Sequence, residues 1–143
     1  MVYLLDTDHL SILQLKTGPA FRSLNARLEM VSSVDVAVSI VSFQEQVRGW
    51  LSFIHQARKP AQLLRGYDHL LQLLKEYCKA YVLPFDAAAQ REMENLQSSK
   101  VRIGTLDLRI AAIATVHGAT VLSRNLRDFR QVPGLVVEDW TVP

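Results

Sequence analysis

Four carboxylates in this sequence are placed where they could act together on one ligand. Each comes just after an apolar, strand-like segment or in the first turn of an expected helix; they are Asp6, Glu45, Asp107 and Asp128. In an open α/β sheet, the strand ends that lead into helices gather at one edge, where ligands bind. The acids are therefore expected to meet in one cleft. The structural alternative for each acid alone is helix capping, as in the capping-box pattern SFQE at 42–45.

A cleft lined by carboxylates favours a hard metal ion. Like charges crowded together repel each other, and a cation between them relieves that repulsion. The only cysteine is Cys78, and no histidine pair has zinc-like spacing, so oxygen ligands would select Mg²⁺ or Mn²⁺. Mg²⁺ leaves positions open for phosphate oxygens. The predicted chemistry is metal-dependent hydrolysis of a phosphodiester bond.

Basic residues surround two of these acids. Between positions 100 and 130, six basic residues outnumber two acids, although the whole chain carries a net charge of only +2. The six are Lys100, Arg102, Arg109, Arg124, Arg127 and Arg130. Phosphate contacts supply most of the affinity of proteins for nucleic acids, so a basic rim around an acidic pocket indicates a nuclease. A solvated helix face is the alternative for each arginine.

The elements that must hold the acids alternate between strand and helix. Apolar, partly β-branched runs predict strands at 2–5, 34–41, 80–85, 119–123 and 135–139. Helices are expected at 6–16, 17–30, 43–58, 63–77, 85–97 and 105–118. Asp8 and Asp86 are the expected N-caps of two of them, and Gly118 the left-handed end of another. This alternation predicts one α/β domain over 1–143, with a mainly parallel sheet of about five strands flanked by helices.

The two helices within 43–77 are expected to form an antiparallel hairpin. Its apolar surface exceeds what one small sheet needs, and it includes Trp50, Leu51, Ile54, Leu70, Leu71 and Leu74. Uncovered apolar patches on soluble proteins usually mark binding sites, so part of this surface is predicted to be shared with a partner. The alternative is that these side chains simply belong to the core.

Composition is that of an ordinary soluble domain, with 49% hydrophobic and 21% charged residues. No apolar run reaches the ~18 residues of a membrane span, and the N-terminus lacks the pattern of a secretory signal. The expected location is the cytoplasm.

Four segments carry a family resemblance: LLDTDHLS, SIVSFQEQVRG, IGTLDLRIAAIATVHGATVLSRN and DFRQVPGLVVEDW. Together they resemble the PIN-domain nucleases, especially the VapC-type toxins of bacterial toxin–antitoxin pairs. The likeness covers both ends of the chain and the second strand, whereas the middle, 51–99, matches only in its helical pattern. The most specific features are Gly104, Asp107, the IAA run, Gly118, Asn125, Asp128, Phe129 and the Pro133, Gly134, Leu135 run.

The resemblance implies a three-layer PIN fold, and it assigns a role in the active site to individual residues. It makes Asp6, Glu45, Asp107 and Asp128 the catalytic acids that bind Mg²⁺ or Mn²⁺. It places Thr7, Ser123, Arg124 and Asn125 in the substrate pocket beside them. It also implies an RNA substrate such as transfer RNA, a homodimer, and a groove for a cognate antitoxin.

Two departures and two alternatives accompany this hypothesis. Asp8 stands where many relatives have Asn or Ser, and Ser123 where Thr is common. A haloacid-dehalogenase-like phosphatase also has an apolar strand followed by Asp-x-Asp, but here His9 and Leu10 follow Asp8, and Asp107 opens a helix. A catalytically inactive PIN-like binding module is the other alternative, against which the presence of all four acids counts.

Overall fold

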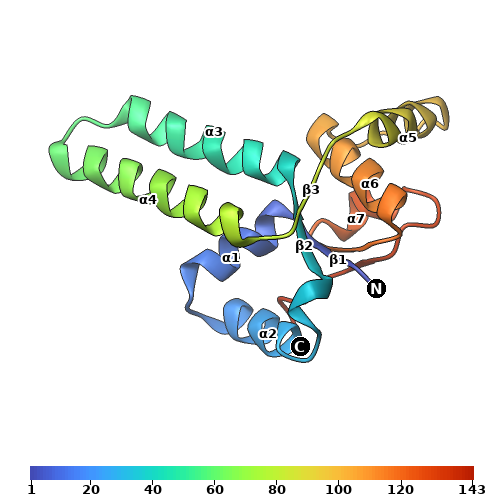
Figure 1. The fold of residues 1–143 in the computed structure, drawn as a ribbon, viewed down its shortest axis with the longest axis horizontal. Helices are drawn as coiled ribbons and strands as arrows, with labels where there is room; N and C mark the ends of the chain where they lie inside the picture. The colour runs from blue at the N-terminus through green and yellow to red at the C-terminus, as the bar shows by residue number, and fades with distance from the viewer.

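The computed structural model describes all residues, 1–143, and has a five-stranded sheet at its centre (Figure 1). The strands are β1 (Tyr3–Leu5), β2 (Val36–Ser39), β3 (Val82–Leu83), β4 (Thr120–Leu122) and β5 (Val137–Glu138). Their order is β3-β2-β1-β4-β5, and every pair is parallel. The expected α/β fold with a mainly parallel sheet is therefore confirmed.

Helices cover both faces of the sheet. They are α1 (Thr7–Leu15), α2 (Pro19–Leu28), α3 (Ile40–Gln56), α4 (Pro60–Lys79), α5 (Ala87–Ser98), α6 (Thr105–His117) and α7 (Leu126–Phe129), with a short 3-10 turn at Ser33–Asp35. Successive strand residues point to opposite faces. Leu4 therefore packs into one core with α5 and α6, whereas Leu5 packs into a second core with α1 and α2. Two cores on either side of one sheet make the three layers that the resemblance implied.

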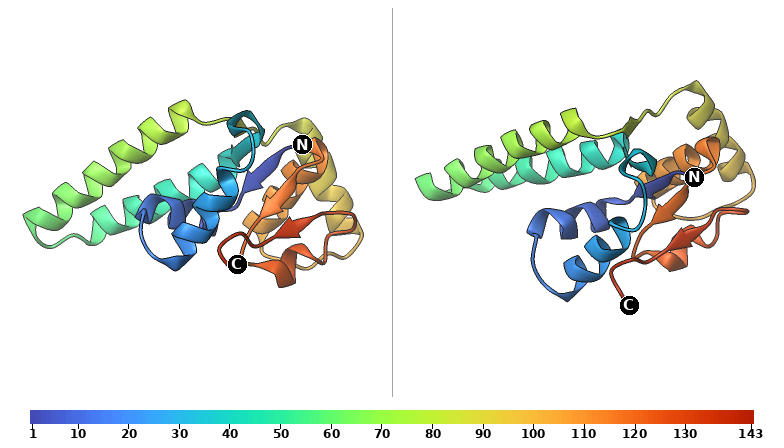
Figure 2. Two further views of the ribbon diagram at one scale, coloured as in Figure 1. Left: turned by 90° about the horizontal axis from the view of Figure 1, so that it is seen from below. Right: turned by 60° about the horizontal axis from the view of Figure 1, so that its bottom comes forward.

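The helical hairpin of α3 and α4 extends beyond the sheet, as the views in Figures 1 and 2 agree. Its helices pack closely at Gly66, where an added Cβ would meet Cγ1 of Ile54 at 2.5 Å. Of the six apolar residues singled out in the sequence, Leu51, Leu71 and Leu74 are exposed. The other three are half-buried: Trp50, Ile54 and Leu70. The expectation of incompletely covered apolar surface is confirmed for half of the set.

Two of the three helix starts for which the sequence predicted a capping residue differ from the prediction. Asp6, not Asp8, is the N-cap of α1, and its carboxylate accepts a hydrogen bond from the Thr7 N–H. Helix α3 starts at Ile40 with Ser39 as its N-cap, so the SFQE segment is already inside the helix and is no capping box. Asp86 caps α5 as expected. The left-handed end of α6 at Gly118, with φ of 60°, is also confirmed.

None of these helices combines the length and the apolarity that crossing a membrane requires.

Candidate active site

Asp6 lies at the point where the order of the parallel strands reverses. The chain runs from β1 to β2 and β3 on one side, then returns to place β4 and β5 on the other. Ligands of open α/β folds bind at such a switch point, outside the carboxyl ends of the strands. Asp6 directly follows β1, and its backbone N–H donates to the carbonyl of Leu122 in β4 at 2.9 Å. The hydroxyl of Ser123, just after β4, donates to Asp6 Oδ2 at 2.7 Å.

The carboxylate of Asp6 is only 5% exposed, and its environment disfavours ionisation. The pKa of Asp6 is raised from 3.8 to about 7, chiefly by burial and also by the negative charges of Asp8 and Asp107. Hydrogen bonds from Ser123 and Thr7 lower it but do not compensate. A cation near Asp6 would favour the charged form and reverse this balance.

Glu45 projects from the second turn of α3, not from its first turn as expected, because the helix begins earlier than the sequence indicated. The Thr7 hydroxyl donates to Glu45 Oε1 at 2.8 Å and lies 3.0 Å from Oγ of the buried Ser42. Thr7 thus links the first turn of α1, next to Asp6, to the acid on α3. The hydroxyl beside the first acid thus contacts another of the predicted acids.

Asp107 and Asp128 share one neutral donor. The side-chain amide of Asn125 lies 3.0 Å from Asp107 Oδ2 and 3.0 Å from Asp128 Oδ2. Burial raises the pKa of Asp107, as do the charges of Glu45, Asp128 and Asp8, against the lowering effect of the Asn125 hydrogen bond. Glu45 on α3 and Asp128 on α7 therefore both act electrostatically on Asp107 on α6.

Asp8 anchors the loop that follows β4. Its Oδ2 accepts the backbone N–H of Arg124 at 2.9 Å and lies 3.3 Å from Oγ of Ser123. Its Oδ1 lies 2.7 Å from Nδ1 of His9. Burial alone would raise the pKa of Asp8, but the hydrogen bonds of His9, Arg124 and Ser123 outweigh it and lower the pKa. Asp8 is therefore engaged with the loop, and Arg124 contributes its backbone while its side chain is exposed.

His9 is a site-adjacent residue that sequence reasoning did not single out. It is completely buried, and its Nε2 accepts the backbone N–H of Trp140 at 3.1 Å. Because Nε2 accepts, Nδ1 carries the proton and donates it to Asp8. His9 thus connects the site to the C-terminal segment. Its position one residue after Asp8 was the only signal in the sequence.

The donor set fits a hard divalent ion. The four predicted acids offer only oxygen atoms, and the raised pKa values of Asp6 and Asp107 reflect repulsion and burial that a cation would offset. No three Asp, Glu, His or Cys side chains are already gathered into a metal-binding cluster. The acids are instead joined in pairs and chains by Thr7, Ser123 and Asn125.

A groove of about 730 Å³ begins at this site and runs between α1, α3 and α4. Thr7 and Glu45 line one end, whereas Trp50, Phe53 and His69 line the rest together with polar residues. The rings of Trp50 and His69 are stacked, 4.2 Å apart and with an angle of 1° between their planes. The groove therefore connects the acidic site to the helical hairpin.

The acids thus lie around a strand-order switch point in a three-layer α/β fold, where ligands of such folds bind. The family model for the PIN domain matches residues 3–135, so this chain belongs to the PIN domain family. The resemblance inferred from the sequence is thereby confirmed. The phosphatase and binding-module alternatives are not favoured by these matches.

Curated relatives are VapC proteins. The chain is 37% identical to ribonuclease VapC1 of Rickettsia felis over 68 residues, which cover 43% of this chain and about half, 51%, of that protein. It is 26% identical to the tRNA(fMet)-specific endonuclease VapC of Shigella flexneri over 143 residues, which cover 97% of this chain and 98% of that protein.

Solved structures share the fold. VapBC-1 from nontypeable Haemophilus influenzae matches with a TM-score of 0.73 and 20% identity, covering 99% of both chains. VapBC-5 from Mycobacterium tuberculosis, a member of the VapBC family of toxin–antitoxin systems, matches with a TM-score of 0.57 and 22% identity, covering 96% of both chains. The PIN-like arrangement is therefore common to these proteins.

Proposed function

We propose that this chain is an endoribonuclease that hydrolyses RNA phosphodiester bonds and depends on Mg²⁺ or Mn²⁺. The observation that carries the proposal is the linked set of acids at the switch point, in which Ser123, Thr7 and Asn125 hold the four carboxylates. Relatives named as ribonucleases and endonucleases support the choice of reaction.

Asp6, Glu45, Asp107 and Asp128 would hold the ion. When bound, it supplies charge neutralisation and Lewis acidity for phosphodiester hydrolysis. The chain's own contribution is to fix the carboxylates before substrate arrives: Ser123 orients Asp6, and Thr7 orients Glu45. Asn125 keeps Asp107 and Asp128 a fixed distance apart through one amide group. Such preorganisation avoids rearranging the site during the reaction.

The substrate and partners follow from the relatives and from the surface. The Shigella flexneri relative is named for transfer RNA, so structured RNA such as tRNA is the proposed substrate. A toxin–antitoxin system among the matched structures supports a cognate antitoxin, which we place in the groove between Glu45 and Trp50. These partners imply a cytoplasmic protein.

The exposed face of the hairpin is the proposed homodimer surface. It carries Leu51, Leu63, Leu64, Tyr67, Leu71 and Leu74. A Leu71→Asp, Leu74→Asp double variant should sediment as a monomer, whereas Val34→Asp, at an exposed apolar residue in the 3-10 turn, should leave the assembly unchanged. A wild-type protein that sediments as a monomer at micromolar concentration would exclude the dimer.

Cleavage of labelled RNA with and without divalent ions tests the reaction. Cleavage is expected with Mg²⁺ or Mn²⁺ and not in EDTA, and Asp6→Asn, Glu45→Gln or Asp107→Asn should each reduce it by ~10² or more. Asp68→Asn removes an exposed carboxylate on α4 and is the matched control. Undiminished cleavage in EDTA or by Asp6→Asn would refute the proposal. Whether a small protein encoded next to this one co-purifies with it and blocks cleavage tests the antitoxin.

A further inference from the structure

Arg109 differs from every other basic residue of the chain. Of 16 lysines and arginines, it alone is half-buried, and all the others are exposed. It lies on α6, two residues after Asp107. The one contact between a lysine or arginine side chain and a carboxylate is that of Arg27 with Glu138, and no side-chain hydrogen bond engages the guanidinium of Arg109. Its guanidinium nitrogens still reach solvent, because the structure has no buried side-chain nitrogen without a partner. A half-buried cation that no protein group pairs with is available to an anionic ligand.

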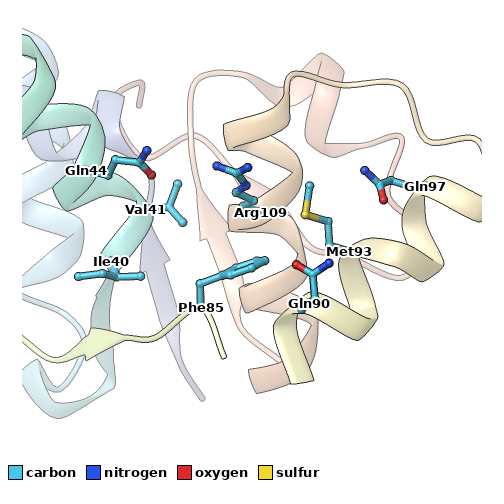
Figure 3. A pocket seen from close by; sticks show the side chains of 8 residues that line it. All are labelled: Ile40, Val41, Gln44, Phe85, Gln90, Met93, Gln97 and Arg109. Atoms are coloured by element: carbon cyan, nitrogen blue, oxygen red, sulfur yellow. The ribbon is translucent and has the colours of Figure 1, made fainter. Parts of the chain in front are cut away.

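The guanidinium of Arg109 faces a pocket of about 310 Å³ between α3, α5 and α6 (Figure 3). Its polar lining consists of the amides of Gln44, Gln90 and Gln97, and no acid is among the lining residues. Val41, Phe85 and Met93 supply apolar walls. In Figure 3, Arg109 and Gln44 point toward one another from opposite helices. The pocket thus offers one positive charge and glutamine amides, of which that of Gln90 already donates to Glu94 Oε1 at 3.0 Å.

The pocket and the acidic site share two helices. On α3, Gln44 lies in the pocket and the next residue, Glu45, in the site. On α6, Arg109 lies in the pocket and Asp107 in the site. The two helices are in contact with each other. Asp107 and Arg109 are two residues apart on α6, so their backbones are close although their side chains leave the helix in different directions. A strand that passes from the acids around this part of α6 would reach Arg109.

We propose that the Arg109 pocket binds a backbone phosphate of the RNA strand, adjacent to the phosphate that is cleaved. This inference rests on the ribonuclease function proposed above. The planar guanidinium matches two phosphate oxygens at once, and the glutamine amides add neutral donors. The volume is at the low end of ligand sites, which suits a phosphate with its sugar and not a larger ligand. Glu45 and Asp107 act on the neighbouring phosphate, so both subsites would belong to one strand.

RNA binding measured apart from cleavage tests the pocket. Fluorescence anisotropy with a labelled single-stranded RNA, in the Asp6→Asn background and Mg²⁺, gives affinity as a function of salt. Adding Arg109→Gln should weaken binding about tenfold. It should also make the slope of log affinity against log salt less steep by about 0.7, the value for one phosphate on a single strand. Arg22→Gln, which removes an exposed arginine of α2, is the matched control and should change neither quantity.

A second variant separates a charged contact from a structural effect. Gln44 is exposed at the pocket edge, so Gln44→Ala should fold normally. It should weaken RNA binding about threefold, as the loss of one neutral hydrogen bond does, and leave the salt slope unchanged. Arg109→Lys should keep the slope and lose part of the affinity, since it keeps the charge without the planar fork.

The outcomes distinguish this inference from the proposed function. If wild type cleaves RNA but Arg109→Gln and Arg22→Gln bind it with equal affinity and slope, the phosphate subsite is wrong and the ribonuclease function stands. If Arg109→Gln keeps RNA binding but loses binding to an acidic protein partner, the anion is a carboxylate and the inference is overturned. If wild type neither binds nor cleaves RNA, both proposals fall.

Discussion

Replacing Asp6 with Asn should stabilise the metal-free protein above neutral pH. The pKa of Asp6 is raised to about 7 in the folded state, whereas an unfolded chain leaves it near 3.8. Between those values the folded protein retains a proton that the unfolded chain has lost, so stability falls as pH rises through this window. Below about pH 4 both states are protonated and Asp6 costs nothing.

The size of the effect follows from the same two pKa values. The difference of about three pH units corresponds to roughly 4 kcal/mol of lost stability at pH 8. Asparagine cannot ionise, so it avoids this cost. It can also keep both hydrogen bonds: Oδ1 can accept the Thr7 N–H, and Nδ2 can donate to Ser123, whose own proton can turn toward Asp8. The expected gain is therefore roughly 2 to 4 kcal/mol at pH 8 and close to zero at pH 4.

Urea unfolding in EDTA, followed by tryptophan fluorescence between pH 4 and pH 8, measures the difference. Asp68→Asn is again the control, because its carboxylate is exposed on α4 and should give no pH-dependent gain. Mg²⁺ should narrow the gap between wild type and Asp6→Asn, since an ion that binds only the folded wild type stabilises it. A gap that is constant with pH, or a wild type that is the more stable protein at pH 8 in EDTA, would refute this reasoning.

Three further predictions follow from single contacts. Thr7→Val should lower kcat about tenfold with little change in KM, because Glu45 loses the hydroxyl that orients it. Thr7→Ser keeps a hydroxyl and should restore activity. Equal kcat values for the Thr7→Val and Thr7→Ser variants would contradict this role. Asp128→Asn should leave more RNA cleavage than substitution of any of the other three acids. Asp128 lies on a four-residue helix, and its only side-chain hydrogen bond comes from Asn125, which also donates to Asp107. Complete inactivity of Asp128→Asn at saturating Mg²⁺ would contradict this ranking of the acids. Gly66→Ala should destabilise the protein by about 1 to 3 kcal/mol, because its Cβ would meet an α3 side chain at 2.5 Å. Gly49→Ala, where the added Cβ has open space, should be neutral or stabilising in thermal melts. Similar shifts in melting temperature for the two variants would contradict this packing argument.

Elements with strong local signals are predicted correctly from the sequence. The boundaries of strands and helices that depend on pairing in the sheet are not. Asp86 and Gly118 were correctly placed because capping depends on residues within one turn. The sequence predicts Asp8 as the cap of α1. The backbone N–H of Asp6 is bonded to Leu122 in β4, which fixes the end of β1 and makes Asp6 the cap.

The start of α3 was missed for a similar reason. The run at 34–41 is β-branched and apolar, and it reads as strand to its end. In the structure, pairing of β2 with β3 stops at Ser39, opposite Leu83, and the Ser39 hydroxyl caps the helix at once. This shift of three residues moves Glu45 from the first to the second turn of α3. Its pairing with Thr7 depends on that shift and was not visible in the sequence.

Asp6 and Asp8 show why an additional acid beside the site need not be an additional metal ligand. They are two residues apart, yet burial raises the pKa of Asp6 while hydrogen bonds lower that of Asp8 against the same effect. Both carboxylate oxygens of Asp8 are hydrogen-bonded: Oδ2 accepts the backbone N–H of Arg124, and Oδ1 accepts the Nδ1–H of His9. Asp8 thereby anchors the loop after β4, whose residues Ser123 and Asn125 contact the other carboxylates. A carboxylate whose charge is already stabilised by fixed donors, such as Asp8, is stabilised little further by a cation. The ionised form of Asp6 is disfavoured, so a cation would stabilise it more.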